Sequence, residues 1–497
     1  MKEYSIREIQ LLMEGGKLSA EKMTKMFLSR IQEIDKQGPR LNSIIEVNPE
    51  AIEIAKTLDK KRKNNEINGP LHGIPIIIKD NINTLDKMQT TAGSLAFKGH
   101  IANEDAFIVK KLRAAGAIIL AKANLSEWAN FRSTRSTSGW SSRGGQTLNP
   151  YALNRNPCGS SSGSAVAVAA NLCSAAIGTE TDGSIICPSQ TNSIVGIKPT
   201  IGLVSRNGII PISHNQDTAG PMARTVQDAA ILLNAIVGID TNDESTVKHH
   251  HDIPSDFTEF LDPDDIDELR IGIARNFFGK NDLVDQIIEK SIEKIKNLGL
   301  EIIDPIEMKS VNELSEYEFQ VLLYDFKNDL NEYLQKYGPI NSLNNIDDII
   351  NFNNEHQEEV MRYFGQELFI MATEKGSIES DDYKEVLKQC YRLARDEGID
   401  AVLKQHDIDV IVAPSGGPAW IIDYINGDHS TGGSSSAAAV SGYPNITIPA
   451  GYIYGLPVGI SFFGGAFQEP KLLKIAYAFE QSTKIRKSPS FLSNIDL

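Results

Sequence analysis

The sequence predicts an α/β fold. Short apolar runs rich in β-branched residues recur along the chain and alternate with segments of helical periodicity, which is the pattern of strands and helices packed in layers. These runs are far shorter than the ~20 residues of a membrane-spanning helix. The chain has 497 residues, of which 41% are hydrophobic, and this is enough for a large core.

The first predicted elements are helices. Residues 19–35 are amphipathic and begin with a serine suited to cap a helix, and residues 49–64 form a second helix. A further helix is expected at residues 105–115. The strands are expected at the apolar runs, which are residues 74–79, 117–121, 271–274, 410–413 and 446–449.

A long segment in the C-terminal half is mainly helical, from about residue 282 to about residue 403. Within it, an apolar stripe at helical spacing predicts a helix with one face toward the core. The stripe consists of Phe319, Leu322, Leu323, Phe326, Leu330, Tyr333 and Leu334. We expect this segment to be an insertion that covers part of the sheet and forms a wall of a substrate site.

Two serines stand in separate glycine-rich turns on either side of an alanine-rich segment. Ser160 lies in P-C-G-S-S-S-G, and Ser184 lies in T-E-T-D-G-S. A serine hydroxyl needs a nearby base and backbone N–H donors to attack a carbonyl at neutral pH. Lys79 ends the apolar run G-I-P-I-I-I-K, where full burial would lower its pKa from ~10.4 by ~3 to 5 units. The pattern predicts a nucleophile site with a lysine base.

These motifs resemble the amidase signature family of Ser-Ser-Lys amide hydrolases. The resemblance rests on K-D-N at Lys79, on G-S-S-S-G, T-D-G-S and V-G-I-K-P-T-I-G-L-V-S, and on G-Y-P-N-I-T-I-P-A-G near the C-terminus. It implies the amidase-signature fold, a large mixed β-sheet surrounded by helices. It also implies a single amidase domain over residues 1–497, with a signature core at about 70–235, a helical insertion at about 282–403 and a C-terminal completion of the sheet at about 404–485.

The same resemblance assigns roles to the site residues. Ser184 would be the nucleophile, Ser160 would relay its proton and be preceded by a cis peptide bond, and neutral Lys79 would be the base. The oxyanion hole would consist of backbone N–H groups in the turn of Thr181, Asp182, Gly183 and Ser184. The family chemistry implies no metal and no organic cofactor.

The resemblance also bears on the substrate. Residues 124–133 and 138–151, together with N-G-D-H at 426–429, resemble bacterial peptide amidases, which convert the C-terminal carboxamide of a peptide to a carboxylate and ammonia. The alternatives are a general aliphatic or aryl acylamide amidase and the glutaminase subunit of a tRNA-dependent amidotransferase, which would need partner proteins. Many family members carry an arginine where this chain has Ile186, so a carboxylate anchor is missing and glutamine is a weaker candidate.

Two further interpretations follow from the same residues. Gly159 to Gly163 fit the G-x-S-x-G elbow of α/β-hydrolases, with Ser161 as nucleophile and with Asp428 and His429 completing a triad. That elbow follows a strand directly, whereas residues 154–158 are polar and contain a proline, which disfavours it. A non-catalytic binding protein on the same fold would be expected to lack a residue of the Ser-Ser-Lys set, and all three are present.

Charge and the N-terminal residues bear on partners and location. The chain has 65 Asp and Glu against 49 Lys and Arg, and its net charge of -16 disfavours nucleic acid and anionic membranes as partners. We expect an amide substrate, small or peptidic, and no obligatory protein partner. The start lacks the apolar segment of a signal peptide, which favours the cytoplasm.

Cysteine and histidine usage adds two expectations. The four cysteines are too few and too dispersed for a disulfide framework, so we expect free thiols in a reducing compartment, with Cys158 and Cys187 as small buried apolar residues beside Cys173 and Cys390. The histidines at 249–251 lack the spacing of zinc motifs and are expected in a solvated loop.

Overall fold

The computed structural model describes residues 1–248, 253–266 and 268–495, so the predicted solvated loop at 249–251 lies outside the described residues. Eleven strands of this part form one mixed sheet in the order β1-β3-β2-β6-β8-β7-β12-β13-β11-β9-β10. These strands are β1 (Ile44–Val47), β2 (Pro75–Lys79), β3 (Ile118–Ala123), β6 (Ala175–Glu180), β7 (Val195–Lys198), β8 (Thr218–Ala223), β9 (Arg270–Ala274), β10 (Glu301–Ile306), β11 (Val410–Pro414), β12 (Asn445–Ile453) and β13 (Leu456–Phe463). A separate pair consists of β4 (Trp140–Ser141) and β5 (Gly145–Gln146).

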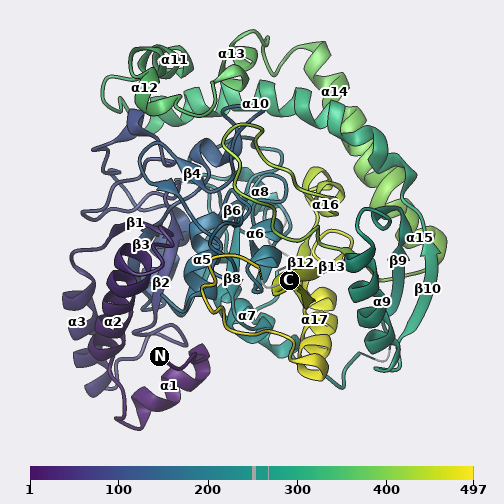
Figure 1. Cartoon of the computed structure of the whole chain (residues 1–497), viewed down its shortest axis with the longest axis horizontal. Coiled ribbons are helices and arrows are strands. Elements are labelled where there is room, and N and C mark those ends of the chain that lie inside the picture. The colour runs from purple at the N-terminus through teal and green to yellow at the C-terminus, as the bar shows by residue number, and fades with distance from the viewer. Residues whose placement is uncertain (249–252, 267, 496–497) are drawn as a thin grey trace.

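Helices surround this sheet, as Figure 1 shows. Those of the first half are α1 (Ile6–Glu14), α2 (Ala20–Arg30), α3 (Ala51–Lys63), α4 (Phe107–Ala114), α5 (Ser162–Ala169), α6 (Ile186–Thr191), α7 (Val226–Ile236) and α8 (Glu244–Lys248). Those of the second half are α9 (Asp282–Lys296), α10 (Leu314–Tyr337), α11 (Ile346–Glu355), α12 (Gln357–Val360), α13 (Glu367–Thr373), α14 (Asp381–Tyr391), α15 (Asp400–His406), α16 (Ser435–Ser441) and α17 (Glu469–Thr483). No helix among the described residues is long and apolar enough to cross a membrane.

The predicted α/β fold and its strands are confirmed. The five apolar runs form β2, β3, β9, β11 and β12, and the three predicted helices are α2, α3 and α4. A π-helical turn, Ile31–Gln37, extends α2 over the rest of the predicted segment. Strands β2 and β3 are buried along their whole length, which explains why they appear in the sequence as nearly continuous apolar runs. Strand β6 is equally buried but contains Thr179 and Glu180, and the sequence analysis did not predict it.

The C-terminal helical segment packs differently from the expectation. It also contains the strand β10 at the end of the sheet. Its long helix α10 buries most of the predicted stripe, but in a second hydrophobic cluster with Phe97, Trp128, Phe131 and Ile212, which lie in loops. Figure 1 shows α10 to α14 as an arc over one end of the molecule. The helices therefore cover the loops at one edge of the sheet instead of a sheet face.

Candidate active site

Lys79 is the last residue of β2 and is fully buried. Strand β2 runs parallel to β6, with Ile78 opposite Ile177, so the carboxyl ends of both strands lie at the same edge of the sheet. Lys79 Nζ lies 2.7 Å from Ser160 Oγ, 3.1 Å from the carbonyl oxygen of Thr179 and 2.8 Å from Thr179 Oγ1. The structure thus brings together Lys79 and Ser160, which are 81 residues apart in the sequence.

The environment of the lysine favours its neutral form. Burial lowers the pKa of Lys79 to about 7, although the negative charges of Asp217 and Glu180 offset part of that effect. Glu180 is buried and Asp217 is partly buried, and the loss of water around them raises the pKa of Asp217 to about 6 and that of Glu180 above its usual range. A substantial fraction of Lys79 is therefore uncharged near neutral pH.

The Ser160 turn lies between Cys158 and the start of α5. The peptide bond between Gly159 and Ser160 is cis. Helix α5 approaches the backbone of another segment at Gly163, where a Cβ atom would lie 2.4 Å from the carbonyl oxygen of Asn124. Only glycine fits at that position, so the second glycine of G-S-S-S-G serves close packing of the helix behind Ser160.

The Ser184 turn connects β6 to α6. Gly183 has φ +76°, a left-handed conformation that suits glycine. Glu180 accepts hydrogen bonds from the N–H groups of Ile185 (2.7 Å) and Ile186 (2.9 Å) and so fixes the end of the turn. The N–H groups of residues 182–184 donate to no other residue that the structure describes. They are available to a ligand oxygen.

A backbone hydrogen bond holds the two serine turns next to each other. The carbonyl oxygen of Ser184 accepts a hydrogen bond of 3.1 Å from the N–H of Ser161. The hydroxyl of Ser184 has no hydrogen-bond partner among the described residues, and Ser160 Oγ contacts Lys79. Catalytic hydrogen bonds are often incomplete without substrate, so this arrangement is compatible with a relay that closes on binding.

A pocket of about 250 Å³ opens beside the Ser184 turn. Its walls come from the two serine turns, from the loop that follows β11 and from the start of α16. The lining residues are Asn130, Ser138, Cys158, Gly159, Asp182, Gly183, Ile186, Cys187, Gln190, Ser415, Gly416, Gly417, Trp420, Asp428, Ser430, Gly432, Gly433 and Ser435. The helical segment α10 to α14, expected as a substrate wall, contributes none of these described lining residues.

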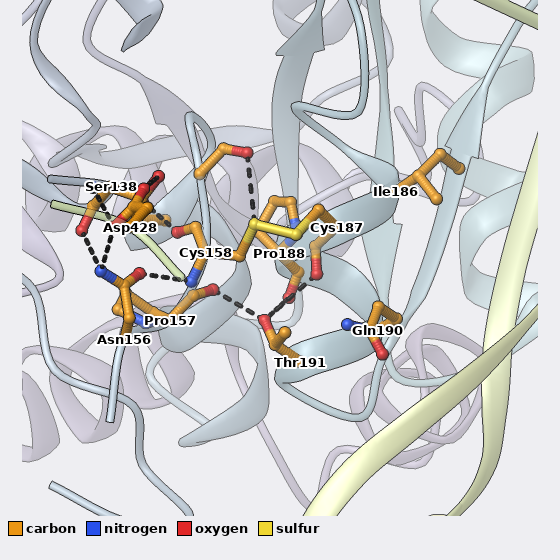
Figure 2. Close-up of a disulfide and its surroundings, with 12 residues drawn as sticks. Ser138, Asn156, Pro157, Cys158, Ile186, Cys187, Pro188, Gln190, Thr191 and Asp428 are labelled. Atoms are coloured by element: carbon orange, nitrogen blue, oxygen red, sulfur yellow. Dashed lines mark hydrogen bonds between the residues drawn. A yellow bond between two sulfur atoms is a disulfide. The ribbon is translucent and has the colours of Figure 1, made fainter. Parts of the chain in front are cut away.

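The cysteine prediction is wrong for two of the four residues. Cys158 and Cys187 form a disulfide, with their Cα atoms 5.9 Å apart (Figure 2). Cys173 and Cys390 are free and buried. The spacing of 29 residues gave no sign of the pairing, because it is the fold that brings the two serine turns together. The argument for a reducing compartment therefore loses its basis.

The geometry does not support the elbow alternative. Ser161 Oγ donates to the carbonyl oxygen of Thr179 (2.9 Å) and accepts from its N–H (3.1 Å), so this hydroxyl is occupied by strand β6. His429 lies 3.3 Å from Asp423, on an exposed loop. Asp428 accepts hydrogen bonds from Ser138, Asn156 and Trp420 and organises the pocket wall instead of serving a histidine.

Sequence reasoning missed two groups around the lysine. Thr179 supplies two of the three contacts of Lys79 Nζ, and Asn81 donates to the Thr179 hydroxyl at 3.0 Å. Asp217 accepts from Thr181 Oγ1 at 2.5 Å and from the N–H groups at 212 and 213. The alternation along β6 could have placed Thr179 on one face, but no sequence signal relates it to Lys79.

The comparison with known proteins identifies the class of the protein as an amide-hydrolysing enzyme. The model of the Amidase family matches residues 22–473 of the chain. The protein therefore belongs to this family, whose signature the sequence analysis identified.

Known proteins similar to the chain agree with this membership. A protein of Arabidopsis thaliana named "Probable amidase" is 40% identical over 99% of this chain and 92% of its own length. The X-ray structure of native peptide amidase from Stenotrophomonas maltophilia has 46% identity and a TM-score of 0.93, covering 98% of this chain and 99% of that one. A protein of Thermoanaerobacter pseudethanolicus that is named as one of the subunits of glutamyl-tRNA(Gln) amidotransferase is 34% identical over 98% of this chain and 99% of its own length.

Proposed function

We propose that the protein hydrolyses the C-terminal carboxamide of peptide amides through Ser184, Ser160 and Lys79. The observation that carries the proposal is the 2.7 Å contact between Lys79 Nζ and Ser160 Oγ in a fully buried site beside the Ser184 turn. A neutral lysine amine has two N–H groups and one lone pair. The N–H groups can donate to the two oxygens of Thr179, and the lone pair then faces Ser160.

The proposed reaction starts with a proton relay. Lys79 accepts the proton of Ser160, Ser160 accepts the proton of Ser184, and Ser184 Oγ forms a bond to the amide carbonyl carbon. The resulting oxyanion accepts hydrogen bonds from free N–H groups of the turn at 181–184. The C–N bond then breaks, and the nitrogen leaves as ammonia with the proton returned by Ser160. Water attacks the acyl-enzyme by the same relay and releases the carboxylate.

The pocket lining supports an uncharged substrate terminus. Asp182 and Asp428 contribute carboxyl groups, whereas no lysine, arginine or histidine is found among the described residues that line the pocket. Ile186 occupies its wall where many family members carry an arginine. A carboxamide can enter such a pocket, while a carboxylate would face acidic groups without a cation. This favours a peptide amide over glutamine, which carries an α-carboxylate.

The similarity to a peptide amidase along nearly the whole chain supports the same substrate class. We also propose that residues 1–497 act as one amidase domain and that the enzyme needs no protein partner.

Covalent labelling tests the nucleophile. A fluorophosphonate should modify Ser184 and should still do so in Ser161→Ala, whereas Ser184→Ala should stay unlabelled and lose at least about 10³-fold in kcat. An adduct on Ser161 of the wild type would contradict the proposal.

Mass spectrometry of a peptide amide tests the substrate class. The expected result is conversion of the terminal amide to an acid with release of ammonia. Internal fragments, or turnover confined to small aliphatic amides or glutamine, would refute the substrate class.

A further inference from the structure

The disulfide lies between the two serine turns. Cys158 comes two residues before Ser160, and Cys187 comes three residues after Ser184. The sulfur bridge therefore connects the segments that carry the proposed relay serine and the proposed nucleophile. Figure 2 shows Asp428, Ser138 and Asn156 on the side of Cys158, whereas Cys187 belongs to helix α6, which also carries Gln190 and Thr191.

Hydrogen bonds also connect each half of the bridge to one of the serine turns. The N–H of Cys187 donates to the carbonyl oxygen of Gly183 at 2.8 Å, which joins the cysteine to the oxyanion turn. The N–H of Cys158 donates to Asn156 Oδ1 at 2.8 Å, and its carbonyl oxygen accepts from Ser162 Oγ at 2.6 Å. A displacement of either sulfur would therefore be transmitted to a serine turn.

The backbone at Cys158 gives a second reason for a covalent restraint. This residue has φ +56°, a left-handed conformation that non-glycine residues rarely adopt. Such conformations persist when the surroundings fix them and are found frequently at functional sites. The hydrogen bonds from Thr191 and Asn192 to the carbonyl oxygen of Pro157 hold the preceding residue against the far end of α6. The disulfide acts nearer to the serines, at the first turn of that helix.

We propose that the Cys158–Cys187 disulfide is a positioning element of the catalytic centre, which holds the Ser160 turn in register with the Ser184 turn. The inference rests on the proposed Ser-Ser-Lys function. Loss of the bridge should lower kcat about 10- to 100-fold, because a displacement of about 1 Å in the reacting groups can cost about 10²-fold in rate. The KM should change much less. Both cysteines line the substrate pocket, and Cys187 is partly exposed, so a bound ligand should shield the bridge from reductants.

The test starts from Cys173→Ala/Cys390→Ala, in which only the bridged cysteines remain. A dithiol reductant converts the disulfide to two thiols and is itself oxidised to a cyclic disulfide. We expect two titratable thiols to appear, with kcat per fluorophosphonate-titrated site falling about 10- to 100-fold and recovering on reoxidation. Circular dichroism should remain unchanged, and a competitive peptide inhibitor should slow reduction. Addition of Cys158→Ser and Cys187→Ser to the same background should reproduce the loss without reductant.

Two results would overturn the inference. One is a fully reduced enzyme that keeps kcat within twofold. The other is a loss of activity that matches loss of folded protein, which would make the bridge merely structural. Ser184→Ala separates this inference from the proposed function, because it leaves the bridge intact. If Ser184→Ala stays active, the proposed function fails. If it is inactive while the reduced enzyme keeps its kcat, only the positioning role fails.

Discussion

The edge of the sheet that carries Lys79 and the helical segment at residues 314–391 differ in what they bury. At the sheet edge, Lys79, several hydroxyl groups and the carboxyl group of Glu180 lie in the interior, and the carboxyl group of Asp217 is partly buried beside them. Helix α10 buries mainly an apolar face that includes Phe326 and Leu330, together with the carboxyl groups of Glu318, Asp325 and Asp329. It exposes polar residues such as Gln335. The first region buries polar groups at a cost in stability because the proposed chemistry needs them there, whereas the second mainly contributes stability.

Burial alone does not mark the base, because Lys122 and Lys198 are fully buried as well, and burial lowers the pKa of each to about 8. Lys122 Nζ donates to the carbonyl oxygen of Ile82 and to Thr90 Oγ1, and Lys198 Nζ donates to the carbonyl oxygen of Pro199. Neither amine donates a hydrogen bond to a serine among the residues that the structure describes. The contact of Lys79 with Ser160 is the distinguishing feature.

The largest effect is expected at the sheet edge. Lys79→Met keeps an unbranched side chain in the buried site and removes the base, so kcat should fall about 10²- to 10⁴-fold while the protein stays folded. In the wild type, activity should rise with pH through about 7, because the neutral form of Lys79 is the active one. Steady-state kinetics from pH 5 to 9 measure both effects. A Lys79→Met enzyme within about threefold of the wild type would exclude the relay.

A change in the helical segment should show the opposite behaviour. Leu330 is fully buried in the second hydrophobic cluster, and Leu330→Ala should lower the free energy of unfolding by about 3 kcal/mol through lost contacts and a cavity. Below the unfolding transition, kcat should stay within about twofold. Gln335→Ala, on the exposed side of the same helix, is the control and should change stability by less than about 0.5 kcal/mol. Denaturation curves measure the change in stability, and steady-state kinetics measure kcat. A tenfold fall of kcat in folded Leu330→Ala would contradict the expectation that this region affects stability and not catalysis.

The smallest effect is expected where the two regions meet. Asp217 belongs to the loop that contacts α10 through Ser213 and Asp325, and its charge raises the pKa of Lys79. In Asp217→Asn the amide oxygen can still accept from the N–H groups at 212 and 213, and the amide NH₂ can donate to Thr181 Oγ1 in place of accepting from it, while the charge is lost. The pKa of Lys79 should then drop, and the acid limb of the pH profile of kcat/KM should move to lower pH by up to about 1 unit. An acid limb that stays in place, or one that moves to higher pH, would show that Asp217 does not act on the base.

The amino-acid sequence alone was enough to predict the α/β class, five of the eleven described strands of the main sheet, several helices and the two serine turns. It did not predict the other six strands, which include β6. The predicted features depend on residues close together in the chain: the runs that form β2 and β3, the amphipathic stripe of α10, and the glycines beside Ser160 and Ser184. The membership of the Amidase family could be predicted for the same reason, because its motifs are local.

Which of these features come into contact depends on the tertiary structure. Lys79 and Thr179 are 100 residues apart, and their contact depends on the parallel register of β2 and β6. The pairing of Cys158 with Cys187 and the packing of α10 on loops instead of a sheet face depend in the same way on segments distant in sequence. A local pattern fixes the conformation of its own segment, but the distances between segments follow from how the whole core packs, and the neighbours of the lysine and the cysteines are set there.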